Sequence, residues 1–304
     1  MNELREYQQE GLEKIRRAYR DGARRVVYVL PTGAGKSYMM GFLLAQKPQD
    51  KAWFCVHTRV LLDQVIKMFE DFGLDFGVIA GGYSENLKAP KQVVSVQAAA
   101  TRVLTAPRLV IFDECHHAVS KRNRAVLQGA EYVLGVTATP LRLDGKGLEE
   151  VFDKLVEGPT MGELAALGFL SRYRLYGTDT EIDVTGLKTQ AGDYHVRELA
   201  EASDKAHLTG DAIEHYQKLS PGRRAVAYCV TVEHAGNVSQ AFNAAGITAA
   251  VLSGDTNNAE RRRIVTAFER GGIQVIANCS VVVEGFDLPA IESVIMLRPT
   301  KSIG

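Results

Sequence analysis

Residues 26–37 read Val-Val-Tyr-Val-Leu-Pro-Thr-Gly-Ala-Gly-Lys-Ser, an apolar run followed at once by two glycines, a lysine and a serine. The apolar run predicts a buried β-strand, and a helical pattern begins after it, near Lys36. Gly33 and Gly35 let the backbone turn its N–H groups inward, and the positive end of the following helix adds to them. This stretch therefore predicts a strand, a phosphate-binding loop and a helix, which together form the nucleotide-binding unit of an α/β protein.

The polar residues of this loop have expected chemical roles. Lys36 would reach the β and γ phosphates of ATP, and the Ser37 hydroxyl would ligate Mg²⁺. The other expected members of the phosphate site are Thr32, Gly33, Ala34 and Gly35. The strict motif has a glycine where this chain has Leu30. The alternative reading is therefore a glycine turn with an incidental lysine.

A pair of acidic residues, Asp113 and Glu114, follows a second apolar run at residues 109–112. A carboxylate at the carboxyl end of a parallel strand lies at the same sheet edge as the phosphate loop. Asp113 would then hold Mg²⁺ and Glu114 would polarise the attacking water, which makes Lys36, Asp113 and Glu114 the candidate catalytic residues. Alone, the two acids would fit a helix cap and its first turn equally well.

Short β-branched runs alternate with helical patterns in both halves of the chain. Strands are expected at residues 26–30, 52–57, 93–96, 109–113 and 132–137, and again at 225–229, 249–253, 274–278 and 293–297. Strands that are apolar throughout, separated by helices, predict parallel sheets covered on both faces. The alternation stops between about residues 154 and 209, so we expect two domains, residues 1–160 and 161–304.

Composition describes an ordinary globular chain of 304 residues with 46% hydrophobic and 24% charged residues. Lys plus Arg and Asp plus Glu both total 36, so the net charge gives no argument for a polyanionic partner. The N-terminus lacks a signal-peptide core, no run is long enough to span a membrane, and the cysteines form no CxxC pair. We therefore expect a cytoplasmic protein with reduced thiols and no membrane partner.

The run Cys115-His116-His117 raises the question of a metal site. Three adjacent residues of a regular element cannot all face one ion, and no further ligand lies at a zinc spacing. We therefore expect no metal at these residues.

Several motifs, taken in order, resemble those of superfamily 2 helicases. Residues 31–37, 113–116 (Asp-Glu-Cys-His) and 137–140 (Thr-Ala-Thr-Pro) resemble motifs I, II and III, and residues 4–9 (Leu-Arg-Glu-Tyr-Gln-Gln) resemble the Q motif. Residues 57–59 resemble motif Ia, and residues 228–235, 253–256 and 283–289 resemble motif IV, its companion and motif V. Among the members of this superfamily, the chain is most similar to RadD-like DNA helicases of bacteria and phages.

The resemblance implies two tandem RecA-like domains with ATP between them, and it assigns roles to further residues. Arg5 and Gln8 would contact adenine, and Gly285 and Asp287 would contact ATP from the second domain. His116, Thr137 and Thr139 would couple the phosphate site to domain movement. The candidates for contact with the nucleic-acid strand are Thr58, Arg59, Gln97, Thr231, Ser253 and Thr256.

Arginines outside these motifs carry less weight. Arg59, at the start of a helix pattern, would serve as well as a solvated surface cation. Arg261, Arg262 and Arg263 lie on one helix pattern and point in different directions, which favours a solvated face over a nucleic-acid site.

The implied function is an ATP-dependent helicase or translocase that uses Mg²⁺ and acts on DNA, with RNA as the less favoured substrate. Alternatives are the motor subunit of a restriction or remodelling complex, and a nucleotide-gated DNA clamp with little turnover. A small-molecule kinase would leave the second half without a role.

The family also has a motif VI, Gln-x-x-Gly-Arg-x-x-Arg, after a segment such as residues 297–302. The sequence stops at Gly304, so we expect a fragment that binds ATP and hydrolyses it poorly. An arginine finger accounts for about 10³–10⁵ in rate.

Overall fold

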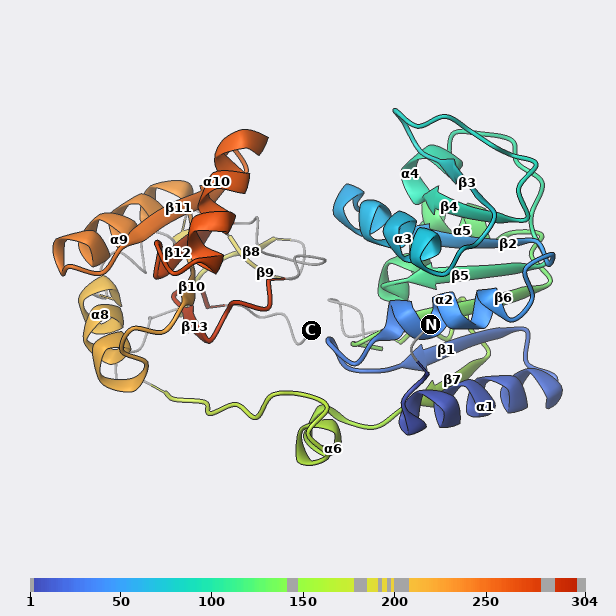
Figure 1. The fold of residues 1–304 in the computed structure, drawn as a ribbon, viewed down its shortest axis with the longest axis horizontal. Helices are drawn as coiled ribbons and strands as arrows, with labels where there is room; N and C mark the ends of the chain where they lie inside the picture. Colours follow the sequence, from blue (N-terminus) through green and yellow to red (C-terminus); the bar gives the residue numbers. More distant parts are fainter. Residues whose placement is uncertain are drawn as a thin grey trace. The chain divides into compact units, whose positions relative to one another are not determined.

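The computed structural model describes residues 3–140, 147–177, 185–190, 193–195, 198–199, 208–279 and 288–299. The chain divides into two compact units, Met1–Arg174 and Leu175–Ser302. In Figure 1 the first unit carries the labels α1 to α6 and β1 to β7, and the second unit carries the labels from β8 onward. Each unit is described by itself below.

The first unit is built on a seven-stranded sheet in the order β3-β4-β2-β5-β6-β1-β7. Every neighbouring pair in this sheet is parallel. All five residues of β2 are buried, as expected for a strand covered on both faces. The strands are β1 (Arg25–Val29), β2 (Ala52–Val56), β3 (Phe76–Ile79), β4 (Lys91–Ser95), β5 (Leu109–Asp113), β6 (Tyr132–Thr137) and β7 (Lys154–Glu157).

Helices cover both faces of this sheet, as Figure 1 shows. One face packs against α1 (Glu6–Arg20), α2 (Lys36–Ala45), α3 (Arg59–Asp71) and α6 (Met161–Ala166). The other packs against α4 (Val96–Ala99), the 3₁₀ helix η1 (Cys115–Val119) and α5 (Lys121–Leu127). Each fully buried Leu, Val or Phe in these two layers contributes about 1.5–3 kcal/mol.

The second unit repeats the pattern on a smaller scale. Its sheet has four parallel strands in the order β11-β12-β10-β13. The core lies on both faces, between the sheet and α8 and α9 on one side and α10 on the other. The elements are α8 (Leu208–Leu219), β10 (Ala225–Tyr228), α9 (Val232–Ala244), β11 (Ala249–Ser253), α10 (Asn258–Glu269), β12 (Val275–Cys279) and β13 (Ser293–Met296). A short antiparallel pair, β8 (Thr189–Gln190) and β9 (Asp193–Tyr194), precedes them.

The predicted α/β class is confirmed in both units, and every predicted strand is present with ends shifted by at most two residues. The first unit continues further than the expected boundary at residue 160. Beyond residue 160, Leu164 of α6 is fully buried in the first core, and Phe169 packs on Tyr7. The division therefore falls at Arg174.

The four cysteines, Cys55, Cys115, Cys229 and Cys279, are all buried thiols. Burial raises the pKa of the Cys55 and Cys115 thiols and raises the pKa of Cys229 to about 12. Within the described ranges, no group of three or more His, Cys, Asp or Glu side chains is placed to hold a metal ion. None of the helices described is both long and apolar enough to cross a membrane.

Candidate nucleotide-binding site

The loop between β1 and α2 adopts the conformation that its glycines permit. Gly33 and Gly35 have φ of 80° and 81°, in the left-handed region that disfavours side chains. A Cβ on Gly35 would lie 2.7 Å from Gln8 Nε2, so a larger residue would displace the Gln8 amide. Lys36 begins α2, is 9% exposed, and donates through Nζ to the Leu30 carbonyl at 3.2 Å. The lysine side chain is therefore folded back toward the start of the loop.

The remaining predicted members of the loop lie around it. Thr32 and Gly33 are exposed, Ala34 is buried, and Ser37, the second residue of α2, is half-buried. The Ala34 N–H donates to the Pro31 carbonyl at 3.2 Å. The loop thus has an exposed part at Thr32 and Gly33 and a buried, hydrogen-bonded part at Ala34.

Two side chains of helix α1 bind the buried part of the loop at Ala34. The Tyr7 hydroxyl and Gln8 Nε2 both donate to the Ala34 carbonyl, at 2.8 Å and 3.1 Å. Gln8 Oε1 accepts from the Arg5 backbone N–H at 3.0 Å, and Gln8 is only 4% exposed. Both ends of the Gln8 amide are thus engaged within the protein, which makes Gln8 a support for the phosphate loop.

An aromatic residue that the sequence analysis did not single out lies beside α1. The Phe169 ring is 5.1 Å from the Tyr7 ring, and the Arg5 guanidinium lies over it at 5.0 Å. Phe169 remains 37% exposed. The next residue, Leu170, comes within 3.2 Å of where a Gly33 Cβ would lie. Arg5, Tyr7 and Phe169 therefore form one cation–aromatic cluster at the side of the loop.

A sequence signal for this segment exists. Thr160 and Glu163 form a capping box at the start of α6, with Glu163 accepting from the Thr160 N–H at 2.7 Å. Gly168, with φ of 78°, ends the helix, and the Phe169 N–H bonds back to the Leu164 carbonyl. The pattern Thr-x-x-Glu followed by Gly-Phe-Leu predicts a short capped helix that returns apolar side chains to the core.

Asp113 ends β5 at the same edge of the sheet and is 3% exposed. Burial, and to a lesser extent the charge of the neighbouring Glu114, raise the pKa of the Asp113 carboxyl to about 6, against the opposing effects of Lys36 and His57. Asp113 Oδ1 accepts from the Glu114 N–H at 3.0 Å. A buried acid with a raised pKa, close to a lysine, is typical of a site that receives a cation.

Glu114 has a strained backbone and a defined set of neighbours. Its φ of 48° makes it the one non-glycine residue of the described ranges with positive φ, at a cost of about 1–3 kcal/mol. Glu114 Oε2 lies 3.5 Å from His116 Nδ1 and 3.4 Å from Thr137 Oγ1. His116 Nδ1 and Thr137 Oγ1 are 3.2 Å apart, and Thr137 Oγ1 accepts from the Thr139 N–H at 3.1 Å. The three residues expected to couple the phosphate site to movement thus share one network with the candidate catalytic acid.

The first-unit candidates for strand contact lie together at the ends of β2 and β4. Thr58 caps α3 by accepting from the Leu61 N–H at 3.3 Å, and Gln97 Nε2 donates to the His57 carbonyl at 2.6 Å. Arg59 donates to the Gly81 carbonyl at 2.8 Å and its guanidinium lies 4.4 Å from the centre of the Tyr83 ring. Arg59 is therefore held by its own unit and is more than a freely solvated cation.

The second-unit candidates are arranged as helix caps and turns. Thr231 caps α9 by accepting from the His234 N–H at 3.0 Å, and Thr256 Oγ1 accepts from the Ser253 N–H at 3.0 Å. Arg263 forms a two-point ion pair with Glu260 of the same helix, as expected for a solvated face. Gly285 and Asp287 lie outside the described residues.

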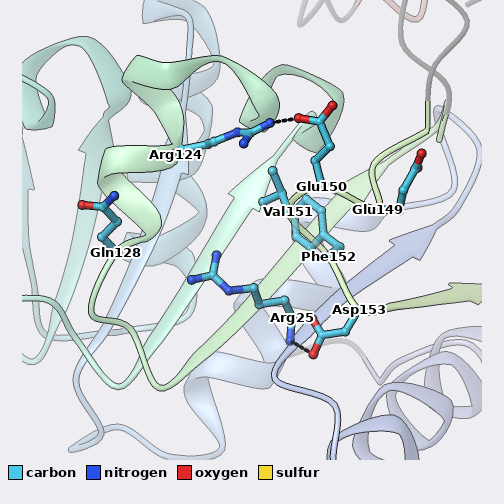
Figure 2. Close-up of a pocket in the computed structure, with 8 residues that line it drawn as sticks. All are labelled: Arg25, Arg124, Gln128, Glu149, Glu150, Val151, Phe152 and Asp153. Atoms are coloured by element: carbon cyan, nitrogen blue, oxygen red, sulfur yellow. Dashed lines mark hydrogen bonds and ion pairs between the residues drawn. The ribbon is translucent and has the colours of Figure 1, made fainter.

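A separate hollow of about 360 Å³ lies at the other end of β1. Figure 2 shows its lining residues, with Arg124 paired to Glu150 and the Arg25 N–H donating to the Asp153 carboxylate. Arg25 is the first residue of β1, whereas the phosphate loop follows its last. This hollow is therefore distinct from the nucleotide site and contains none of the predicted residues.

Two protein-family models and several known proteins are similar to this chain. Residues 1–142 match the family model "Type III restriction enzyme, res subunit", and residues 205–304 match "Helicase conserved C-terminal domain". The chain is 31% identical over 279 residues to a 51.5 kDa protein of a Lactococcus phage, covering 90% of this chain and 59% of that protein. It is 26% identical to the putative ATP-dependent helicase IRC3 of Saccharomyces cerevisiae, covering 98% of this chain and 47% of IRC3. The chain thus spans about half the length of these relatives.

Among solved structures, the helicase domain of Pyrococcus furiosus Hef superposes with a TM-score of 0.59 at 16% identity, covering 96% of this chain and 90% of that one. This likeness shows that the two units are tandem RecA-like domains. With helicase motifs I, II and III on the first sheet, and the two family models on successive parts of the sequence, the chain belongs to the superfamily 2 helicases.

Proposed function

We propose that this chain is the motor portion of an ATP-dependent helicase or translocase that acts on DNA. One observation carries the proposal: the buried Lys36 and Asp113 lie at the same sheet edge as Glu114, whose carboxylate belongs to the network of His116 and Thr137. This arrangement combines a site for a triphosphate with hydrogen bonds that would transmit the presence of the γ phosphate to Thr137 at the end of β6.

The phosphates would lie in the loop formed by residues 31–37, with the N–H groups of the loop and the Lys36 ammonium facing their oxygens. Mg²⁺, when bound with ATP, would neutralise charge on the β and γ phosphates. Ser37 and Asp113 fit this ion because hydroxyl and carboxylate oxygens are its preferred ligands, and because the raised pKa of Asp113 reflects a buried charge that a cation would stabilise. Glu114 would orient the attacking water and accept its proton.

The base would lie against the cluster of Arg5, Tyr7 and Phe169. Arg5 is exposed, and an aromatic face stacks with any base. The Gln8 side chain donates to the Ala34 carbonyl, so a movement of the loop would also move α1.

The strand would be held through its phosphates, which suits movement without sequence readout. Candidates are Thr58, Arg59 and Gln97 in the first unit and Thr231, Ser253 and Thr256 in the second. A threonine hydroxyl that accepts a helix N–H still has a proton to donate to a phosphate. Gly285 and Asp287 stay predicted contacts of ATP. DNA is the favoured substrate because the family model matching the first unit is named for a subunit of a restriction enzyme.

The test is ATP hydrolysis with and without single-stranded DNA, in a buffer with and without Mg²⁺, with Lys36→Ala as control. We expect stimulation by oligothymidine that disappears with Lys36→Ala, and weaker stimulation by oligouridine. Nucleotide-dependent DNA binding without turnover, also in a chain extended past Gly304 through motif VI, would indicate the clamp instead. A rate of ATP hydrolysis that no nucleic acid changes would contradict the proposal. The restriction or remodelling subunit remains a version of the same motor with a protein partner.

A further inference from the structure

We propose that His117 is a positioning residue that links nucleic-acid contact at the β2 and β4 ends to the candidate general base Glu114. The inference rests on the proposed function and adds a residue to which no role has been assigned. Three imidazole rings lie in a row in space. The ring centroids of His57 and His117 are 4.5 Å apart, and those of His117 and His116 are 4.1 Å apart. His117 is the middle member.

One end of this row of tilted rings lies in the expected strand-contact segment. His57 follows β2 directly and precedes Thr58 and Arg59 in the chain. Its carbonyl accepts from Gln97 Nε2 at 2.6 Å, and Gln97 Oε1 in turn accepts from the Ser95 hydroxyl at 2.9 Å. The His57 backbone is thus bound to Gln97, a candidate for strand contact, while the His57 ring contacts His117. Any shift of this segment moves the His57 ring.

The other end of the row contacts the network of Glu114 and Thr137. His116 Nδ1 lies 3.2 Å from Thr137 Oγ1 and 3.5 Å from Glu114 Oε2. Glu114 is held at a φ of 48°, a conformation that persists only where its surroundings impose it. A change in the His116 ring would therefore change the position of the Glu114 carboxylate.

The backbone of η1 is anchored independently of the His117 ring. Cys115 and Ala118 are fully buried, and the His117 carbonyl accepts from Asn123 Nδ2 at 2.7 Å. Substitution of the His117 side chain leaves these contacts in place. The ring can therefore be changed without removing the helix that carries Glu114's neighbours.

The experiment measures the coupling between two ligands at equilibrium and so does not depend on turnover. The dissociation constant of Mg²⁺–mant-AMPPNP is measured with and without oligothymidine, and that of labelled oligothymidine with and without nucleotide. The two ratios must agree by linkage, and effector coupling is typically about 5–150-fold. For His117→Ala we expect both ratios to fall to within about 2-fold of one, with the affinity for nucleotide alone nearly unchanged.

Two further variants separate positioning from a structural role. His117→Phe keeps an aromatic ring between His57 and His116 and should restore at least half of the coupling. His57→Ala combined with His117→Ala should lose no more coupling than either change alone. His215→Ala, on α8 in the second unit, is the matched control.

Each outcome has a defined meaning. Unchanged coupling in His117→Ala, no restoration by His117→Phe, additive losses in the double variant, or loss of nucleotide affinity with an unchanged ratio would each overturn the inference. Absence of coupling in the unsubstituted protein would instead contradict the proposed function.

Discussion

The two units use the same βα framework and treat its carboxyl edge in opposite ways. In the first unit the edge buries Lys36 and Asp113, whose charges need a ligand or each other. In the second, among the residues described, the edge after β10 is closed by neutral hydrogen bonds: Thr231 caps α9, and the Val230 N–H donates to His234 Nδ1 at 3.3 Å. The comparison teaches that, among the described residues, the first unit keeps a buried lysine and a buried carboxylate at this edge, at a cost in stability.

Glu114→Gln tests the chemical side of this comparison and has the largest expected effect. Removal of a general base lowers turnover by about 10²–10⁴-fold, whereas affinity for mant-ATP should change little because the phosphate loop is untouched. Single-turnover hydrolysis with labelled ATP measures the rate. The matched control is Glu233→Gln in the first turn of α9, at the corresponding edge of the second unit. If the two variants hydrolyse ATP equally, the assignment of Glu114 is wrong.

Asp113→Asn tests the cost of the buried charge. The folded pKa of about 6 lies above the ordinary value of 3.8, so the folded chain binds more protons than the unfolded chain between these pH values. Stability contributed at this position therefore falls as pH rises from about 4 to about 6 and stays low above it. At pH 8 without nucleotide, the variant should gain on the order of 1–3 kcal/mol in unfolding free energy.

Urea unfolding followed by Trp53 fluorescence measures this effect, because the single tryptophan lies in β2 and so reports on the first unit. The gain should shrink as the pH is lowered through 6, and Asp255→Asn, on the exposed turn after β11, should change stability by less than about 0.5 kcal/mol. A less stable Asp113→Asn protein at pH 8 would contradict the argument. The same variant should lose the Mg²⁺ dependence of nucleotide binding.

Phe169→Ala tests whether the first unit binds a base beside its loop. Loss of one base–aromatic contact costs about 1–3 kcal/mol, so ATP affinity should fall about 10-fold while inorganic triphosphate binds as before. Competition against mant-ATP measures both ligands, and Phe169→Tyr should retain affinity. Equal losses for ATP and triphosphate would mean that Phe169 only supports the loop through its neighbour Leu170.

Thr231→Ala and Thr231→Asp separate the cap of the second unit from its expected strand contact. Alanine removes the cap and should cost about 1 kcal/mol. Aspartate retains a cap acceptor and suits the positive helix end, yet it repels phosphate. Circular dichroism during thermal unfolding and anisotropy of labelled oligothymidine give the two readouts, with Thr58→Ala and Thr58→Asp as the first-unit pair. If Thr231→Asp binds oligothymidine as well as the unsubstituted chain, Thr231 is a cap alone.

Local pattern was sufficient for much of the fold and for the polar members of the site. The apolar run before Pro31 and the one before Asp113 each predicted a strand whose end carries a functional residue, because strand, turn and helix are consecutive there. Phe169 escaped prediction because its partner Tyr7 lies at the other end of the first unit's sequence. The double engagement of Gln8 escaped for the same reason, since Ala34 is 26 residues away. Strand β7 escaped because only Val156 of its four residues is buried.

The buried cysteines offer a way to follow the two units separately. Cys55 and Cys115 belong to the first unit and Cys229 and Cys279 to the second. Alkylation requires an exposed thiolate, so each pair reacts only when its own unit opens. A time course of iodoacetamide labelling read by intact mass would therefore show two successive steps of two adducts, and peptide mapping would identify which unit opens first. Nucleotide should delay the Cys55 and Cys115 step through the phosphate loop, and a delay of the Cys229 and Cys279 step as well would support the predicted contacts of Gly285 and Asp287 with ATP.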